Sequence, residues 1–127
     1  MNTYEKELFE LVNNPEYTFY KLKVNGTFGI DDFIETLDGI VKDEKSFAGI
    51  IRLMDMFSPR IMLPKEKFRK IESSDRIDLR EFKKNDIRVY VIMQGKTFYV
   101  VTGGHKQDQK KDIANFKQDV KDFPKEE

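Results

Sequence analysis

Three neighbouring stretches in the second half of the chain have the pattern of strands, residues 76–82, 87–94 and 97–102, and apolar and polar residues alternate along the first of them. A period of two predicts β-strands, because successive side chains of a strand point to opposite faces. Residues 87–94 are almost all apolar or aromatic, which is typical of a central strand. Short polar turns separate the three stretches. The sequence therefore predicts a three-strand meander that stops at Gly103 and Gly104.

Three other stretches carry apolar residues at intervals of three and four. This spacing predicts helices over residues 30–41, 46–57 and 107–123, each with one apolar side. A short charged link joins the first two helices, so we expect them to form an antiparallel helix hairpin.

The N-terminal region reads as one more helix and one more strand. Residues 2–13 have an amphipathic pattern with Asn2 as a possible N-cap, so the segment 1–16 is expected to add a short helix. Alternation over residues 17–24 predicts a strand, and residues 67–71 fit a weak edge strand.

The order of these elements predicts the fold class. Helix, strand, helix pair, three-strand meander and helix follow one another, so strands and helices are segregated. This segregation favours an α+β fold: a small, mostly antiparallel sheet with helices on one face. The length of 127 residues favours a single domain over 1–127, with residues 124–127 as a frayed tail.

Composition narrows the class of protein. Hydrophobic residues make up 39% and charged residues 36%, and the 11 Phe and 5 Tyr need a core, so a folded globular chain is expected rather than a disordered one. The lack of cysteine excludes disulfides and thiolate metal sites. No apolar run reaches the roughly 18 residues of a membrane-spanning helix, and the acidic start does not resemble a signal peptide. We therefore expect a cytoplasmic protein without a membrane partner.

The charges are balanced overall but unevenly distributed. Residues 80–111 hold eight Lys or Arg against three Asp or Glu, a net charge of +5, whereas residues 1–64 hold seven against eleven, a net of −4. The basic stretch is suited to a phosphate backbone, although a solvated charged surface gives the same pattern.

Three residues are candidates for chemistry. His105 follows a predicted strand and two glycines and could titrate near neutrality, or it is a surface histidine without a task. Arg80 lies on the polar face of its predicted strand. Arg88 stands in an otherwise apolar strand, where it either pairs with Asp78 or Glu81 or is available for a phosphate.

Further side chains near the same end could bind RNA. Backbone N–H groups at a helix N-terminus favour anions, and neighbouring lysines add to this preference. An aromatic strand residue can stack on a base, but it more often packs in the core. The candidates for RNA binding are Lys83, Lys84, Tyr90, Lys106, Gln109 and Lys110. No phosphate-loop motif, dinucleotide fingerprint or metal-ligand spacing is present, so no cofactor and no metal are expected.

The order and identity of these residues resemble the second half of the RelE/HigB-type toxins of bacterial toxin–antitoxin systems. The resemblance rests on IDLREF, which includes Arg80, on DIRVYVIMQGKTFYVV, which includes Arg88, and on GGHKQDQKKD, which includes Lys106, Gln109 and Lys110. It extends over about residues 19–123 and implies a RelE-like fold. Asp108 and Asp112 depart from the family pattern, which has Thr and Pro at these places.

The resemblance also implies a function. Toxins of this family are metal-independent mRNA endonucleases that act with the ribosome and are restrained by an antitoxin protein. By position, Arg80 would stabilise the transition-state charge, Arg88 would bind phosphate, and His105 would be an acid or base. The alternative is a non-catalytic module on the same fold that binds RNA or protein. A less favoured alternative is an interaction protein that dimerises through its N-terminal helix.

Overall fold

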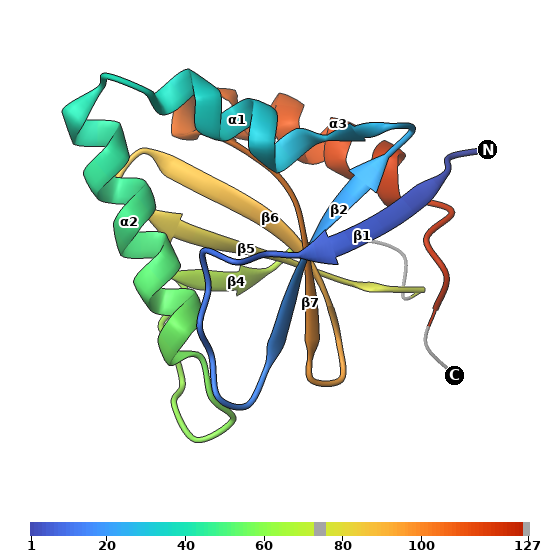
Figure 1. Ribbon diagram of the computed structural model, residues 1–127, viewed down its shortest axis with the longest axis horizontal. Helices are drawn as coiled ribbons and strands as arrows, with labels where there is room; N and C mark the ends of the chain where they lie inside the picture. The colour runs from blue at the N-terminus through green and yellow to red at the C-terminus, as the bar shows by residue number, and fades with distance from the viewer. Residues whose placement is uncertain (73–75, 126–127) are drawn as a thin grey trace.

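The computed structural model describes residues 1–72 and 76–125, which form a mixed sheet with helices on both of its faces (Figure 1). The strands are β1 (Tyr4–Leu8), β2 (Thr18–Val24), β3 (Thr27–Phe28), β4 (Phe68–Lys70), β5 (Asp78–Lys84), β6 (Ile87–Gln94) and β7 (Thr97–His105). The helices are α1 (Gly29–Leu37), α2 (Val41–Met56) and α3 (Gln109–Val120), and the short 3₁₀ turn η1 (Lys106–Asp108) leads into α3. The fold is therefore α+β, as the sequence predicts.

The strands follow the order β1-β2-β7-β6-β5-β4 across the sheet, and β3 pairs with the end of β2. Strands β4 to β7 form an antiparallel meander, and β6 has the bounds expected from its apolar run. Only one pairing between described strands is parallel, that of β2 with β7. This pairing joins the N-terminal strands to the meander.

Both faces of the sheet are buried, which corrects the expectation of helices on one face. Helices α1 and α2 cover the face that carries Val89 and Val91 of β6, and this side holds one core cluster. Helix α3 covers the face of Tyr90 and Ile92 and forms a second cluster with Phe116. The physical reason lies in β6, whose first six residues are all buried, so each face of the strand needs a cover.

The N-terminal segment is a strand, and the helix expected there is absent. Strand β1 pairs antiparallel with β2, with Tyr4 opposite Val24. The side chain of Asn2 donates to the Gln118 and Asp119 carbonyl oxygens, both at 3.0 Å, so it caps the C-terminal end of α3 instead of its own segment. The pairing with β2 gives the backbone N–H and C=O groups of this segment hydrogen-bond partners, whereas a short isolated helix is only marginally stable.

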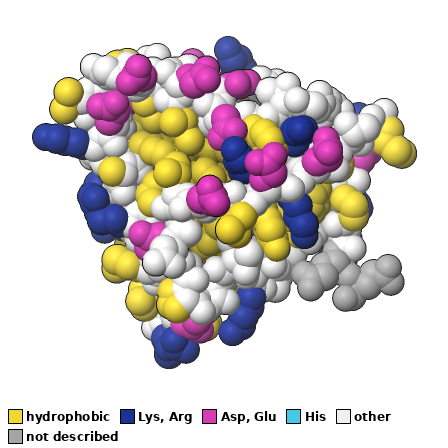
Figure 2. All heavy atoms as spheres, in the orientation of Figure 1, with side chains coloured by type: hydrophobic (Ala, Val, Ile, Leu, Met, Phe, Trp, Pro, Cys, Tyr) yellow, Lys and Arg dark blue, Asp and Glu magenta, His cyan; other side chains and the backbone are white. Residues whose placement is uncertain are grey.

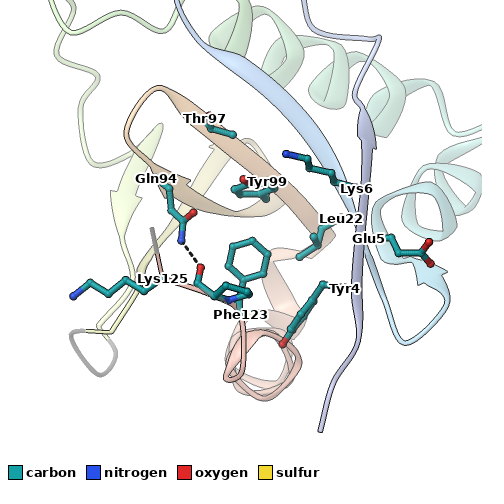
Figure 3. A pocket seen from close by; sticks show the side chains of 10 residues that line it. Tyr4, Glu5, Lys6, Leu22, Gln94, Thr97, Tyr99, Phe123 and Lys125 are labelled. Atoms are coloured by element: carbon teal, nitrogen blue, oxygen red, sulfur yellow. Dashed lines mark hydrogen bonds between the residues drawn. The ribbon is translucent and has the colours of Figure 1, made fainter. Parts of the chain in front are cut away.

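Aromatic contacts fix this arrangement (Figure 3). The Tyr4 ring meets the Phe123 ring edge to face at 5.2 Å, and its hydroxyl donates to the Asp119 carbonyl oxygen at 2.6 Å. Tyr99 of β7 contacts Phe123 from the sheet at 4.9 Å. The side chain of Gln94 donates to the Pro124 carbonyl oxygen at 2.9 Å, as the dashed line in Figure 3 shows. The chain after α3 is therefore held against the sheet up to this point.

The two N-terminal helices do not form the expected antiparallel hairpin. Helix α1 packs over β2 and β7, whereas α2 packs over β5 and β6, and Figure 1 shows that the two run in different directions. The turn between them is shorter and earlier than expected, since α2 already begins at Val41. Gly39 has a φ of +83°, a left-handed conformation that suits glycine.

Strand β7 continues through both glycines at which the sequence predicts its end. A Cβ at Gly103 would overlap the ring of Phe33 from α1, and a Cβ at Gly104 would overlap the carboxylate of Asp112 from α3. The glycine pair thus lets a helix approach the strand closely from each face. Among the described residues no helix is long and apolar enough to cross a membrane.

Candidate functional site

The sheet divides the candidate residues between its two faces. Directly paired residues of an antiparallel ladder share a face, so the register assigns each side chain to one side. Lys83 pairs with Arg88, and both lie on the α3 face with Tyr90. Arg80 pairs with Val91, Lys84 with Ile87, and Ile87 with His105, so these three candidates lie on the face of α1 and α2.

The side chains on the α3 face form one polar group, which we name the α3 cluster: Arg69, Glu81, Lys83, Arg88, Tyr90 and Gln109. At its centre the carboxylate of Glu81 is fully buried. It accepts from Arg69 Nε at 2.6 Å and from Gln109 Nε2 at 2.9 and 3.2 Å. Glu81 therefore joins the edge strand β4, the meander and the first residue of α3.

Arg88 is buried without a carboxylate partner among the described residues. Its Nη1 donates to the carbonyl oxygens of Asn85 at 2.7 Å and Ile87 at 3.0 Å, and its Nε has no partner in the described part of the chain. Asn85 has a φ of 51°, so the tight turn between β5 and β6 curls its carbonyl oxygen toward the guanidinium. Of the two alternatives that the sequence leaves open, the pairing with Asp78 or Glu81 is not formed, and backbone carbonyl dipoles hold the charge instead.

Tyr90 belongs to the core and offers no exposed ring for stacking on a base. It is fully buried, and its ring lies 5.5 Å from that of Phe116. Burial and the nearby charges of Glu81 and Asp112 raise the pKa of its hydroxyl, which therefore stays protonated. The hydroxyl has no hydrogen-bond partner among residues 1–72 and 76–125. It is thus a buried donor beside Arg88.

The surroundings of the cluster shift the pKa of two further side chains, Lys83 and Asp112. Burial lowers the pKa of Lys83, helped by the charges of Arg69 and Arg88 and opposed by Glu81. Burial also raises the pKa of Asp112, and so does the neighbouring charge of Asp108. The α3 cluster therefore has crowded cations, and beside it lies the Asp112 carboxyl group, which binds a proton more readily than usual.

The start of α3 adds exposed charge to the cluster. Lys106 and Lys110 are solvent-exposed and form no ion pair with any described residue. Asp108 occupies the N-cap position but makes no capping hydrogen bond. The N-terminal end of the helix thus keeps its preference for an anion, with two lysines beside it.

The opposite face holds Arg80 in an ion pair and His105 in a hydrogen-bond contact, each with a different carboxylate. Arg80 donates to both carboxylate oxygens of Asp78, at 2.6 and 3.0 Å, and lies 5.3 Å over the Phe68 ring. His105 Nε2 lies 3.0 Å from a carboxylate oxygen of Asp43 in α2. The structure therefore does not bring Arg80, Arg88 and His105 to one site.

Lys84 does not belong to the α3 cluster either, because its side chain lies on the other face of the sheet. A Cβ at Gly49 of α2 would lie 3.2 Å from Lys84 Cγ, so Lys84 runs along that helix on the face away from Lys83. No group of three metal-binding side chains occurs in the portion of the chain that the structure describes.

Sequence analysis did not identify Arg69, Glu81 or Asp112 as members of the site. Alternation marks Glu81 as sharing a face with Leu79, a buried position, and a carboxylate there needs a cation. The partner lies 12 residues away on β4, and only the strand pairing identifies it. For Asp112 the available signal was its position in the first turn of a predicted helix that follows two glycines.

We expect Asp112→Asn to raise the free energy of unfolding at pH 7 and to leave it nearly unchanged at pH 3. The folded pKa of Asp112 lies above the ordinary value of 3.8, so between these two values the folded chain binds more protons than the unfolded chain. Its contribution to stability therefore falls as the pH rises through this window, and asparagine removes that loss. Urea unfolding at both pH values measures the effect. An equal change at both would contradict the assignment.

No family model, no curated protein and no solved structure matches this chain.

Proposed function

We propose that this protein binds the phosphate backbone of RNA with the α3 cluster and the lysines at the start of α3. The observation that carries the proposal is the buried guanidinium of Arg88, which has no carboxylate partner among the described residues and whose Nε makes no hydrogen bond to any of them. Lys83 lies opposite Arg88 in the ladder. A buried cation without a counter-charge is unfavourable, and a phosphate oxygen would supply that charge. Lys106 and Lys110 extend the positive surface outward.

The resemblance to RelE/HigB-type toxins supports RNA as the source of the phosphate. Arg88, Lys106, Gln109 and Lys110 carry much of that resemblance, and all four lie at or beside the α3 cluster. In that context the ligand would be mRNA on the ribosome in the cytoplasm of a bacterium, and an antitoxin protein would restrain the activity.

Metal-independent cleavage of mRNA is the second candidate function. The observation that favours it is that three groups share the α3 face: the protonated Tyr90 hydroxyl and the Arg88 Nε, neither with a hydrogen-bond partner among the described residues, and the Asp112 carboxyl, whose pKa is raised by burial. Asp112 lies against Gly104, which pairs with Arg88 across the ladder. An arginine beside an acid–base group can stabilise charge that develops on a phosphate. Arg80 and His105 do not enter this proposal, because each contacts a carboxylate on the other face.

Fluorescence anisotropy with a labelled single-stranded RNA tests the binding proposal. The double variant Lys106→Glu/Lys110→Glu is expected to weaken binding by tenfold or more, and to reduce the dependence of log K on log salt by about 1.4 for two lost phosphate contacts. The matched control Lys121→Glu/Lys125→Glu changes the net charge equally at exposed positions beyond the other end of α3 and should leave binding nearly unchanged. Equal losses in both variants, or no binding by the wild type, would refute the proposal.

The same RNA, run on a denaturing gel after incubation with and without ribosomes, separates binding from cleavage. A cut product with the wild type that disappears in Arg88→Gln supports cleavage at the α3 cluster. A product that persists in Arg88→Gln but disappears in His105→Ala would move the reaction to the other face. Binding without any product leaves the chain as a binding module.

A further inference from the structure

A second surface lies on the other side of the molecule, between β1, α1 and α2. Two hollows of 540 and 440 Å³ share the side chain of Ile34, one beside β1 and one between the two helices. We call them together the acidic groove. Figure 2 shows an apolar floor at this place, with acidic side chains along its border.

The floor of the acidic groove is apolar and partly accessible. Phe9, Leu37 and Phe47 belong to the core but line the hollows with one side. Leu8 and Leu11 stand beside them with 56% and 54% of their surface exposed. Leucine side chains so open next to a hollow are typical of a contact surface.

The rim of the acidic groove is negatively charged. Its charged residues are Glu7, Glu10, Asp31, Glu35, Asp38 and Glu44 against the single cation Lys21. Lys21 is already paired with Asp31 at 2.7 Å. None of the other five carboxylates has a Lys or Arg within 4.0 Å among the described residues. The groove therefore repels RNA and attracts a cation.

We propose that the acidic groove binds a basic amphipathic helix of a partner protein. Such a helix carries apolar residues three or four positions apart on one side, and two of these would fill the two hollows on either side of Ile34. Lysine or arginine residues along its flanks would meet the rim carboxylates that have no cationic partner among the described residues, and this complementarity also selects against acidic partners. The area beside Leu8 and Leu11 would lengthen the contact.

This site is independent of the proposed RNA function. The acidic groove lies on the side of α1 and α2, whereas the α3 cluster lies on the opposite face of the sheet. A partner helix in the groove would leave Lys83 and Arg88 uncovered by that helix. Loss of one binding activity therefore leaves the other testable.

The test uses the ¹⁵N-labelled full chain and three synthetic helical peptides observed by NMR. The first peptide has leucines at intervals of three and four with lysines on both flanks. The second has glutamate in place of each lysine, and the third has serine in place of each leucine. We expect the first alone to shift the amide signals around Leu8, Ile34 and Phe47. Equal binding of the glutamate or serine peptide, shifts centred elsewhere, or no shifts at 1 mM peptide would overturn the proposal.

Charge reversal on the rim gives the second half of the test. Glu10→Lys/Glu35→Lys is expected to weaken binding of the lysine peptide by at least tenfold. The control Glu66→Lys/Glu72→Lys makes the same change at exposed positions outside the groove and should alter binding less than twofold. Sedimentation velocity excludes a second copy as occupant: dimerisation of the free chain that is lost in Glu10→Lys/Glu35→Lys would overturn the partner proposal.

Discussion

Arg69→Leu is expected to lower the free energy of unfolding by about 3–5 kcal/mol, more than the loss of its partner Glu81. The two side chains meet at 2.6 Å, but Glu81 is fully buried whereas the Arg69 side chain is 34% exposed. Without Arg69 the buried carboxylate keeps, among the described residues, only the amide of Gln109 as a neutral donor. Without Glu81 the arginine can turn to water. Urea unfolding followed by circular dichroism measures both variants.

The double variant Arg69→Leu/Glu81→Leu provides the control. Replacing a buried ion pair by apolar side chains of similar volume is often neutral, so the double variant should recover most of the stability that Arg69→Leu loses. Losses that simply add would show that the pair is not coupled. Equal losses in the two single variants would contradict the asymmetry of burial.

The meander was predictable because alternation reports burial, and burial is the property that the fold preserves. The expected bounds of β6 agree with the structure, and β4 lies within the weak edge strand expected at residues 67–71. The error at the N-terminus has a different origin. Leu8, Phe9, Leu11 and Val12 have helical spacing, but Phe9 and Val12 pack on the core after the strand has ended. The N-terminal segment becomes a strand because it can pair with the open edge of β2, and the local spacing of apolar residues gives no sign of that edge.

The candidate site was only partly predictable, because the charged residues of a segment do not show by their number on which face of the sheet each side chain lies. Lys83 and Lys84 are neighbours in sequence and point to opposite sides of the sheet. The two-residue turn between β5 and β6 sets Lys83 opposite Arg88 and thereby excludes Arg80 from their surroundings. A register shift of one residue would exchange the faces, so the grouping depends on turn geometry.

The basic side chains of residues 80–111 therefore lie on two different faces of the sheet. The α3 face receives a buried guanidinium and accessible lysines. The other face receives Arg80, which pairs with Asp78, and His105, whose Nε2 contacts a carboxylate oxygen of Asp43. The acidic surplus of residues 1–64 gathers in part at the acidic groove. A chain with no net charge thus presents surfaces of opposite sign, which suits two different ligands better than one.

Phe98→Ala is expected to destabilise the fold by about 3–5 kcal/mol, because it removes the central ring of the main core. Phe98 is fully buried on β7, next to the parallel partner β2. Its ring stacks on that of Phe19 at 4.6 Å and meets that of Phe57 at 5.0 Å. Tyr17, Phe68 and Phe82 complete the shell at 5.5 to 6.4 Å. A smaller residue leaves a cavity that these surrounding rings can fill only in part.

Two variants make this result specific. Phe98→Leu keeps most of the volume and should lose less than half as much stability as Phe98→Ala. Tyr99→Ala removes a ring of similar size from the next position, where the side chain is only partly buried on the other face of the same strand, and should also lose less. Thermal and urea unfolding measure all three. The β2–β7 pairing joins the N-terminal strands to the meander through these rings, so a small effect of Phe98→Ala would show that the backbone ladder alone holds the two halves together.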